Sequence, residues 1–558
     1  MIVRSWFGGA RFLKYGTLGW RLTPLAFAIC TIIMILLLPL FPSQDGPIHL
    51  YYVDVLRNLL AHTGPYAQYF EVKSYLTPYM LEYYALLGLE QFFSPFVSEE
   101  MLISTYVLMF ILSFRYLLRS VTEYPTPWAL VGALFCLNIY VYMGFLNYAI
   151  GTALVLLLSG CWLRWMRQLT VRRIAALGGG FILLVFTHPL PPAAFLSFAG
   201  VYLAVSFISE WNSDPSARKR TLHSFGRPLA ALAFMGVVAS IWIIHFTNDS
   251  KPVPKGTDAG KTLSLFYRIV IELVFFRTIP IHIGMLRFAL TFLILSIAIA
   301  LIIALVRHKC YGAIPLSLTI FTTICFILSS AAPDKFRNAG ANFFSTRFSV
   351  FWIVFLITAA ASVKPSRRFS TWIGIAAFAI AAVILPMHWI YLSRTARDMN
   401  VALNVPLVKP GSMGMLIADK DALANDNDNE IEIVKPYMWT GVHFFRESQA
   451  ILTNAPWMDF KYIMLRPKIV DPWTYEDDLR YVPTEALDAL NSDSRISVDF
   501  VGRFGPDGRH TSAVIQRLGL PLIGESPNLT FYARPSALRP RSAQSRSGSN
   551  NIALTAQK

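Results

Sequence analysis

Long apolar runs recur along the first 400 residues, and each is long enough to cross a lipid bilayer as a helix. About 17 to 22 apolar residues in a helix span a hydrocarbon core of about 30 Å. Backbone polar groups in lipid must be satisfied within the segment, so an isolated span is helical. The pattern therefore predicts a mainly α fold, a multi-pass membrane bundle of about eleven helices. The runs begin near Leu25, Met101, Pro127, Leu146, Ile174, Leu190, Pro228, Phe288, Tyr311, Phe348 and Thr371.

The composition and the cysteines agree with a membrane protein. Hydrophobic residues make up 55% of the 558 residues and the mean hydropathy is +0.48, above the usual range of soluble globular chains. The five cysteines lie in or beside apolar runs without a CxxC pair, which argues against disulfides and a thiolate metal site. No small-x-small cleavage site follows the first run, so we expect a retained span rather than a signal peptide.

The distribution of charge predicts the orientation in the membrane. The formal net charge is +16, and short cytoplasmic loops of membrane proteins collect lysine and arginine. The segment Ser74–Phe93 is apolar but carries Glu82 and Glu90. If it does not cross, every strongly basic short loop falls on the side of the N-terminus. We therefore expect an inner N-terminus, an outer C-terminus, and Ser74–Phe93 on the outer face. The basic loops are the N-terminal segment, Arg115 with Arg119, residues 164–173, residues 218–220, Arg307 with Lys309, and residues 364–368.

The outer loop of residues 42–100 begins with a helical pattern. Apolar residues between Ile48 and Leu60 recur at helical spacing, which predicts an amphipathic helix on the membrane surface. Asp45 precedes the dipeptide "GP", a pattern typical of a helix N-cap. The same place at the mouth of a bundle also suits a proton acceptor. His49 lies on the polar face, either within such a site or as an interfacial histidine without a partner.

The same loop holds a second expected helix and an expected polar pair. The residues after Thr77 predict another interfacial helix. Residues three or four positions apart are neighbours on a helix surface, so Asp54 is expected to pair with Arg57 or Asn58.

The order of these features resembles the GT-C superfamily of integral membrane glycosyltransferases. The likeness consists of a first span, an aspartate directly after it, and an outer loop with two surface helices ahead of a multi-span bundle. It implies sugar transfer from a polyprenyl-phosphate carrier, with an acidic residue of the first outer loop as catalytic base, here Asp45. The segment "QDGPIH" lacks the paired acidic signature of the protein mannosyltransferase branch, so no subfamily, donor or acceptor follows.

An inverting transfer also needs cations or donors that stabilise the released phosphate. Arginine suits this role because its fork of N–H groups matches phosphate oxygens. Candidates on the expected outer face are Lys335, Arg337 and Arg347, together with His282 and His188.

Each of these candidates has a simpler alternative. Arg347 begins an apolar helix, where a snorkelling contact to lipid headgroups is the alternative. His188 lies in the proline-rich turn "FTHPLPP", where it could merely cap backbone groups. Asp45, His49 and His188 could together ligate a divalent metal, but nothing in their spacing demands one, so no metal and no cofactor is predicted.

Beyond the bundle of residues 1–400, the composition turns polar. Short apolar segments alternate with helical ones, which predicts a small extracytoplasmic α/β domain over residues 401–533. The basic, serine-rich tail of residues 534–558 has no periodicity and is expected to be disordered.

Three functions fit this pattern. The first is an inner-membrane glycosyltransferase that uses a lipid-linked donor and an envelope glycan or lipid acceptor among membrane lipids. The second is a transporter or flippase of lipid-linked or polar cargo, and a non-catalytic assembly protein is a third possibility. Charges sit mostly at the ends of spans, which favours the enzyme over transport. No nucleotide-binding or hydrolase motif occurs, and the basic excess points to cytoplasmic loops rather than nucleic acid.

Overall fold

The structure is a computed structural model of the whole chain. It describes residues 9–72, 76–213, 216, 218–247, 284–308, 312–332, 344–418, 440–452, 465–467, 498–504, 509–525 and 529–540.

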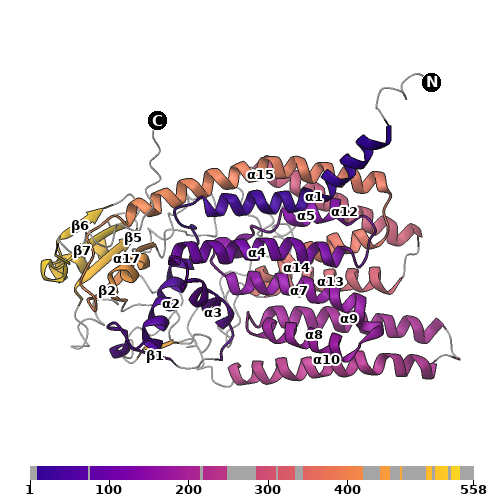
Figure 1. Cartoon of the computed structure of the whole chain (residues 1–558), viewed down its shortest axis with the longest axis horizontal. Coiled ribbons are helices and arrows are strands. Elements are labelled where there is room, and N and C mark those ends of the chain that lie inside the picture. Colours follow the sequence, from indigo (N-terminus) through magenta and orange to yellow (C-terminus); the bar gives the residue numbers. More distant parts are fainter. Residues whose placement is uncertain are drawn as a thin grey trace.

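The chain is a multi-pass helical membrane protein, and each predicted apolar run contains a helix (Figure 1). These helices are α1 (Gly9–Leu36), α4 (Pro95–Leu118), α5 (Pro125–Ala133), α7 (Leu146–Trp165), α8 (Val171–Val185), α9 (Leu190–Ser213), α10 (Arg218–Thr247), α12 (Gly284–His308), α13 (Ala313–Ala331), α14 (Phe344–Ser362) and α15 (Arg367–Ala402). The short helices α6 (Ile139–Tyr142) and η2 (Met166–Gln168) flank α7.

Among the described residues, eight helices are long and apolar enough to cross a membrane. Helices α5 and α8 and the apolar part of α1, Leu22–Leu36, are shorter than that limit. Helix α5 ends early because the chain turns at Leu134–Leu137 before it continues into α6. The number of eleven crossings therefore stays a prediction.

The two ends of the bundle differ in what they carry. The first loop and the C-terminal sheet lie together at one end, called the loop end below (Figure 1). The turns after α4, α7, α9 and α14 lie at the opposite end, called the basic end (Figure 1). This arrangement places the predicted basic loops on one side and the first loop with the C-terminal region on the other. The basic end contains Arg119, Arg164, Arg167, Arg172, Arg173, Arg218, Arg220, Arg367 and Arg368.

The first loop consists of short elements that stay at the loop end. They are α2 (Gly46–Leu60), η1 (Tyr66–Gln68), β1 (Phe70–Val72) and α3 (Met80–Leu89). Helix α3 has only ten residues and packs against α2, α4 and α7, so the described part of Ser74–Phe93 does not cross the bundle. These residues stay at the loop end, and the side of the membrane on which the segment lies stays a prediction.

The C-terminal domain is α/β, with a five-stranded sheet in the order β3-β2-β5-β7-β6. Strands β3, β2 and β5 run parallel, whereas β7 and β6 are antiparallel to their neighbours. A separate strand, β4, pairs with β1 of the first loop through Phe70 and Pro467. The elements are β2 (Met413–Ala418), α17 (Thr440–Ser448), β3 (Ile451–Leu452), β4 (Leu465–Pro467), β5 (Phe500–Phe504), α19 (Arg509–Leu518), β6 (Leu522–Glu525), β7 (Leu529–Ala533) and η5 (Pro535–Ala537).

Residues 534–540, the first part of the expected disordered tail, are folded, so the prediction is wrong for them. Residues 534–540 form η5 and a β-bridge between Leu538 and Val408. Arg539 Nε donates to the carbonyl oxygen of Val408 at 2.8 Å, and Arg539 Nη2 donates to that of Ser448 at 2.9 Å. These backbone acceptors lie about 90 to 130 residues away in the chain, which is why the local composition did not reveal them. Residues 541–558 lie outside the described part of the chain.

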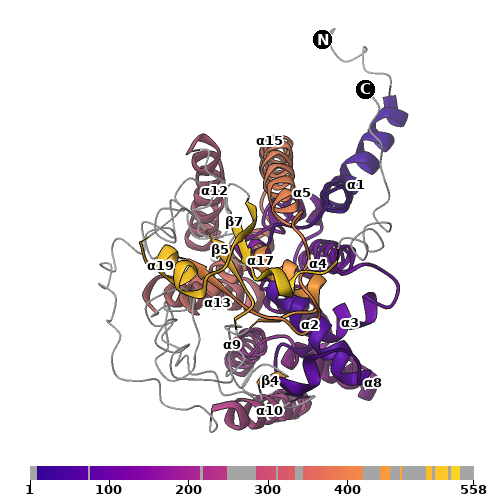
Figure 2. The same ribbon diagram turned by 90° about the vertical axis from the view of Figure 1, so that its left-hand side faces the viewer.

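Helix α2 is buried rather than lying exposed at an interface, so that prediction is wrong. Helices α3 and α17 pack on it, as the view onto the loop end shows (Figure 2). Both its apolar face, with Tyr51, and its polar face, with Asp54 and Asn58, are buried. Tyr51 Oη donates to the carbonyl oxygen of Ala450 at 3.2 Å and accepts the N–H of Leu452 at 3.1 Å. One tyrosine thus joins the first loop to the sheet.

Candidate functional site

Asp45 sits at the N-cap of α2, and its side chain is buried. The carboxylate makes no capping hydrogen bond to α2, although Gln44 Nε2 donates to Asp45 Oδ1 at 3.3 Å. The N-cap interpretation is therefore correct for the backbone and wrong for the side chain. An N-cap aspartate usually accepts a hydrogen bond from a backbone N–H of the first helical turn, and the Asp45 carboxylate does not.

Gly144 brings the turn before α7 against Asp45. The N–H of Asp45 donates to the carbonyl oxygen of Met143 at 3.1 Å. Gly144 has a φ of +79°, and a Cβ built there would lie 2.7 Å from Gly46 N and 3.1 Å from Asp45 N. Only glycine combines that backbone conformation with so close an approach. The segment 143–148 is thus held beside the candidate base.

Glu82 lies on the acidic side of the site and is held by Asn147. Asn147 Nδ2 donates to Glu82 Oε2 at 2.7 Å, and the Glu82 N–H donates to Asn147 Oδ1 at 2.9 Å. Burial raises the pKa of Glu82 well above its usual value, and the neighbouring carboxylates of Glu99 and Asp45 raise it further. Neighbouring carboxylates raise each other's pKa, so Glu82 and Asp45 are electrostatically coupled. Ser43 Oγ holds Glu99 in turn by donating to its Oε1 at 2.8 Å.

Arg347 and His188 form the basic side of the site. Both side chains are buried, and Arg347 Nη1 lies 2.7 Å from His188 Nε2. The N–H of Leu190 donates to His188 Nδ1 at 3.0 Å. Burial, followed by the charge of Arg347, lowers the pKa of His188 well below its usual value, so the imidazole is neutral. A neutral imidazole accepts only one of these two donors, and it cannot neutralise the guanidinium.

No carboxylate of the described residues forms an ion pair with Arg347, and its Nε has no partner there. The rings of Phe145 and Tyr148 face the guanidinium, with centroids 5.1 Å and 5.7 Å from its Cζ. The hydroxyl of Tyr148 donates to the carbonyl oxygen of Arg347. Aromatic faces attract a cation but leave its charge in place. A buried arginine in such surroundings is suited to bind an anion.

The two sides are joined through one short segment. Residue 144 contacts Asp45, residue 145 faces Arg347, residue 147 binds Glu82 and residue 148 contacts both Arg347 and His188. Tyr79, just before α3, packs edge-on against His188 with centroids 5.0 Å apart. Sequence reasoning identified Asp45, His188 and Arg347 as candidate site residues. It missed Glu82 and Asn147, because these two residues pair across 65 positions of the chain.

His49 is next to the site but has a structural partner. Its Nδ1 lies 2.9 Å from the hydroxyl of Tyr83, and burial lowers its pKa to about 4. His49 is thus neutral at physiological pH, and the alternative of a partnerless interfacial histidine is wrong. The catalytic role of His49 stays a prediction.

The remaining candidates lie outside the described residues. These are Lys335, Arg337 and His282. Within the described ranges, no group of three histidine, cysteine, aspartate or glutamate side chains is arranged to hold a metal ion. His188 has a donor at each ring nitrogen, so it is not free to join Asp45 and His49 around a cation.

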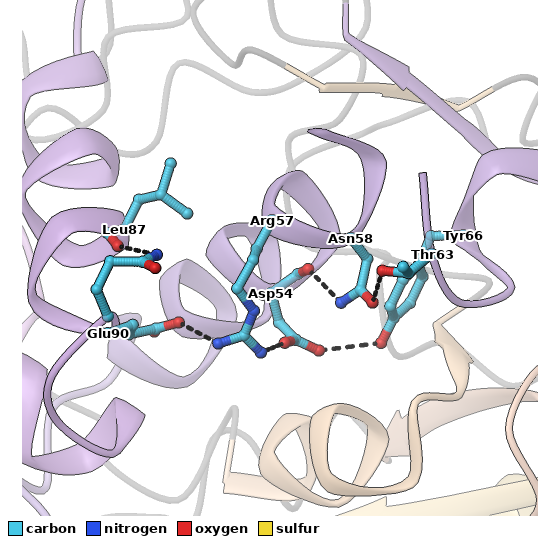
Figure 3. A network of polar contacts seen from close by, with 8 residues as sticks. Asp54, Arg57, Asn58, Thr63, Tyr66, Leu87 and Glu90 are labelled. Atoms are coloured by element: carbon cyan, nitrogen blue, oxygen red, sulfur yellow. Dashed lines mark hydrogen bonds and ion pairs between the residues drawn. The ribbon is translucent and has the colours of Figure 1, made fainter. Parts of the chain in front are cut away.

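A second polar network lies where α17 meets α2 (Figure 3). Asp54 pairs with Arg57, as expected, and Arg57 Nη1 also reaches Glu90 Oε2 at 3.2 Å. The hydroxyl of Tyr66 donates to Asp54 Oδ2 at 3.4 Å. Arg446 of α17 is buried over the ring of Phe96, with its Cζ 4.6 Å from the centroid.

Arg446 acts on this network through its charge. Burial raises the pKa of Asp54 and raises that of Glu90 to about 7, whereas Arg57 and Arg446 lower both. The C-terminal domain thus supplies a positive charge that helps to keep the carboxylates of the first loop ionised. Sequence reasoning missed this residue because no local pattern brings α17 to α2.

Glu90 makes the stability of this junction depend on pH. A folded-state pKa of about 7, against 4.5 in the unfolded chain, means that the folded protein binds the proton more tightly. Its contribution to stability is complete below about pH 4.5 and is lost as the pH rises through about 7. We expect the melting temperature of the detergent-solubilised protein to fall by a few degrees between about pH 5 and pH 8. Glu90→Gln should flatten this dependence, whereas Glu123→Gln at the basic end should not; equal slopes for the two variants would contradict the assignment.

No protein-family model matches this chain, and no curated protein does. Among solved structures, it is similar to the crystal structure of ArnT from Cupriavidus metallidurans bound to undecaprenyl phosphate. The match covers 94% of this chain and 99% of that chain, with 13% sequence identity and a TM-score of 0.42. It extends over nearly the whole length of both chains, but at this identity and score it assigns no family, activity or site.

Proposed function

We propose that this protein is a membrane glycosyltransferase that moves a sugar from a polyprenyl-phosphate donor to an envelope acceptor at the outer face. The observation that carries the proposal is the buried Arg347, which has no carboxylate partner among the described residues and is linked to Asp45 by residues 144–148. A base and an anion site on either side of one short segment are what transfer from a phosphate leaving group requires.

In the proposed reaction, Asp45 accepts the proton of the acceptor hydroxyl. The hydroxyl oxygen forms a bond to the anomeric carbon of the donor sugar while the bond from that carbon to the phosphate oxygen breaks. The electron pair of that bond leaves with the lipid phosphate, whose added negative charge is stabilised by Arg347. His188 and the rings of Phe145 and Tyr148 hold the guanidinium in place. Glu82 keeps α3 against the start of α7 through Asn147.

The orientation follows from charge. The arginine-bearing turns gather at the basic end (Figure 1), and such turns stay on the cytoplasmic side. The loop end, with Asp45 and the C-terminal domain, then faces the outside of the inner membrane. Lipid-linked sugars and envelope acceptors are both accessible there.

An assay with purified protein tests the proposal. Radiolabelled polyprenyl-phosphate sugars are supplied as donors and a membrane extract as acceptor. Label transferred to an extractable glycan or lipid, in proportion to protein, supports group transfer. No transfer from any donor, together with uptake of the labelled lipid or its headgroup in vesicles, would instead support the transporter.

A further inference from the structure

A pocket of about 390 Å³ opens beside the turn from α9 to α10, and this turn lies at the basic end (Figure 1). It lies between the start of α10, the end of α9 and η2. The residues that line it are Met166, Arg167, Glu210, Ser213, Arg220, Thr221, Ser224, Phe225 and Pro228. The proposed sugar transfer uses none of them.

The pocket has a charged rim and an apolar floor. Arg167 pairs with Glu210 across the rim, so Arg220 leaves the lining with a net positive charge. The hydroxyls of Ser213 and Ser224 donate to carbonyl oxygens of their own helices, at 2.5 Å and 2.9 Å. The side chains that can donate to an anion are therefore mainly the guanidinium groups, whose geometry suits phosphate oxygens.

Other arginines at this end are occupied outside the pocket. Arg164 Nε donates to Ser120 Oγ at 2.8 Å, and Arg173 Nη1 donates to the carbonyl oxygen of Gln168 at 2.8 Å. Arg218 stacks over the ring of Trp211, with its Cζ 5.0 Å from the centroid. The chain thus places two arginines of this cluster, Arg167 and Arg220, in the pocket lining.

The apolar floor continues into the membrane-facing surface of α10. Phe225 and Pro228 lie one to two turns beyond Arg220, and the exposed Leu229 follows directly after Pro228. Most of α10 is not buried by the rest of the protein. A charged group at the membrane boundary with an apolar path below it matches a lipid headgroup and its chains.

We propose that this pocket binds the phosphate of an anionic phospholipid in the leaflet at the basic end. The test is native mass spectrometry of the detergent-solubilised full chain, titrated with phosphatidylglycerol or with phosphatidylcholine. The first phosphatidylglycerol should bind more tightly than phosphatidylcholine. Arg220→Gln should raise the apparent Kd of phosphatidylglycerol about tenfold, because one charged hydrogen-bonding partner of the phosphate is lost.

Two control variants distinguish binding in the pocket from attraction of the lipid to the general positive charge of the basic end. Arg173→Gln removes the same charge nearby without touching the lining and should leave the Kd unchanged. Ser224→Trp keeps both arginines but fills the pocket, and it should also weaken binding. Equal affinity of wild type and both pocket variants would overturn the proposal. If an equal concentration of inorganic phosphate displaces phosphatidylglycerol, the pocket binds free phosphate rather than a lipid headgroup, and the proposal of a lipid site is wrong.

Discussion

Replacing Asp45 by asparagine should lower the rate of sugar transfer by about 10²- to 10⁴-fold, the usual contribution of a positioned general base. Asparagine keeps the size of the side chain and can still meet the Gln44 amide, but it cannot take a proton from the acceptor hydroxyl. Because the acceptor proton moves in the transition state, kcat should fall more than KM changes. The measurement is the initial rate of label transfer from the polyprenyl-phosphate donor that the wild type uses.

Asp54→Asn is the matched control for this variant. Asp54 lies on the same helix and is also buried, but it is paired with Arg57 and accepts from Tyr66 at the α17 junction. We expect Asp54→Asn to lower the melting temperature and to keep the transfer rate within a few-fold of wild type. An Asp45→Asn protein that transfers sugar at the wild-type rate would remove Asp45 from the mechanism.

The features that sequence reasoning predicted are those set by local pattern. The length of the apolar runs located a helix in each of the eleven runs, and the charge balance predicted that Ser74–Phe93 does not cross the bundle. The position of Asp45 at the start of α2 followed from the residues directly after it. For the helices and for Asp45 the determining residues lie within one or two turns of the feature, whereas the charge balance draws on basic loops as far along the chain as residues 364–368.

The features that it missed depend on contacts between distant segments. Asn147 meets Glu82 across 65 residues, and Tyr51 meets Ala450 across 399 residues. The burial of α2 was missed for the same reason, because the polar face that looked solvated is covered by α17 and its Arg446. The sequence alone does not show which distant segment supplies the partner of a charged residue, because that depends on the fold. The short α5 illustrates a different limit, since an apolar run does not show where a helix ends.

Arg347 and Arg446 have different surroundings, and we expect them to have different functions. Both are buried at the loop end. Arg446 lies among carboxylates, since it acts on Asp54 and Glu90 and pairs with Glu447 at 3.8 Å. Arg347 faces a neutral imidazole and two aromatic rings. Removing one partner of a buried charge network is destabilising, whereas removing a buried charge that lacks a counter-ion is not.

Arg347→Gln should therefore lower kcat/KM for the lipid-linked donor by about 10²- to 10³-fold without lowering the melting temperature. Glutamine keeps hydrogen-bonding capacity but not the charge that stabilises the leaving phosphate. Arg347→Lys should recover part of the loss, because it restores the charge without the two-point fork. Transfer kinetics and thermal unfolding of the same preparations measure both quantities.

Arg446→Gln, the matched control, should show the opposite signature, with a lower melting temperature and a transfer rate within a few-fold of wild type. The comparison is decisive because the two substitutions are chemically identical and both sites are buried. If Arg347→Gln unfolds more readily than Arg446→Gln, Arg347 stabilises the bundle through a contact to the protein itself. If instead it stays folded and transfers sugar at the wild-type rate, the leaving phosphate is bound elsewhere.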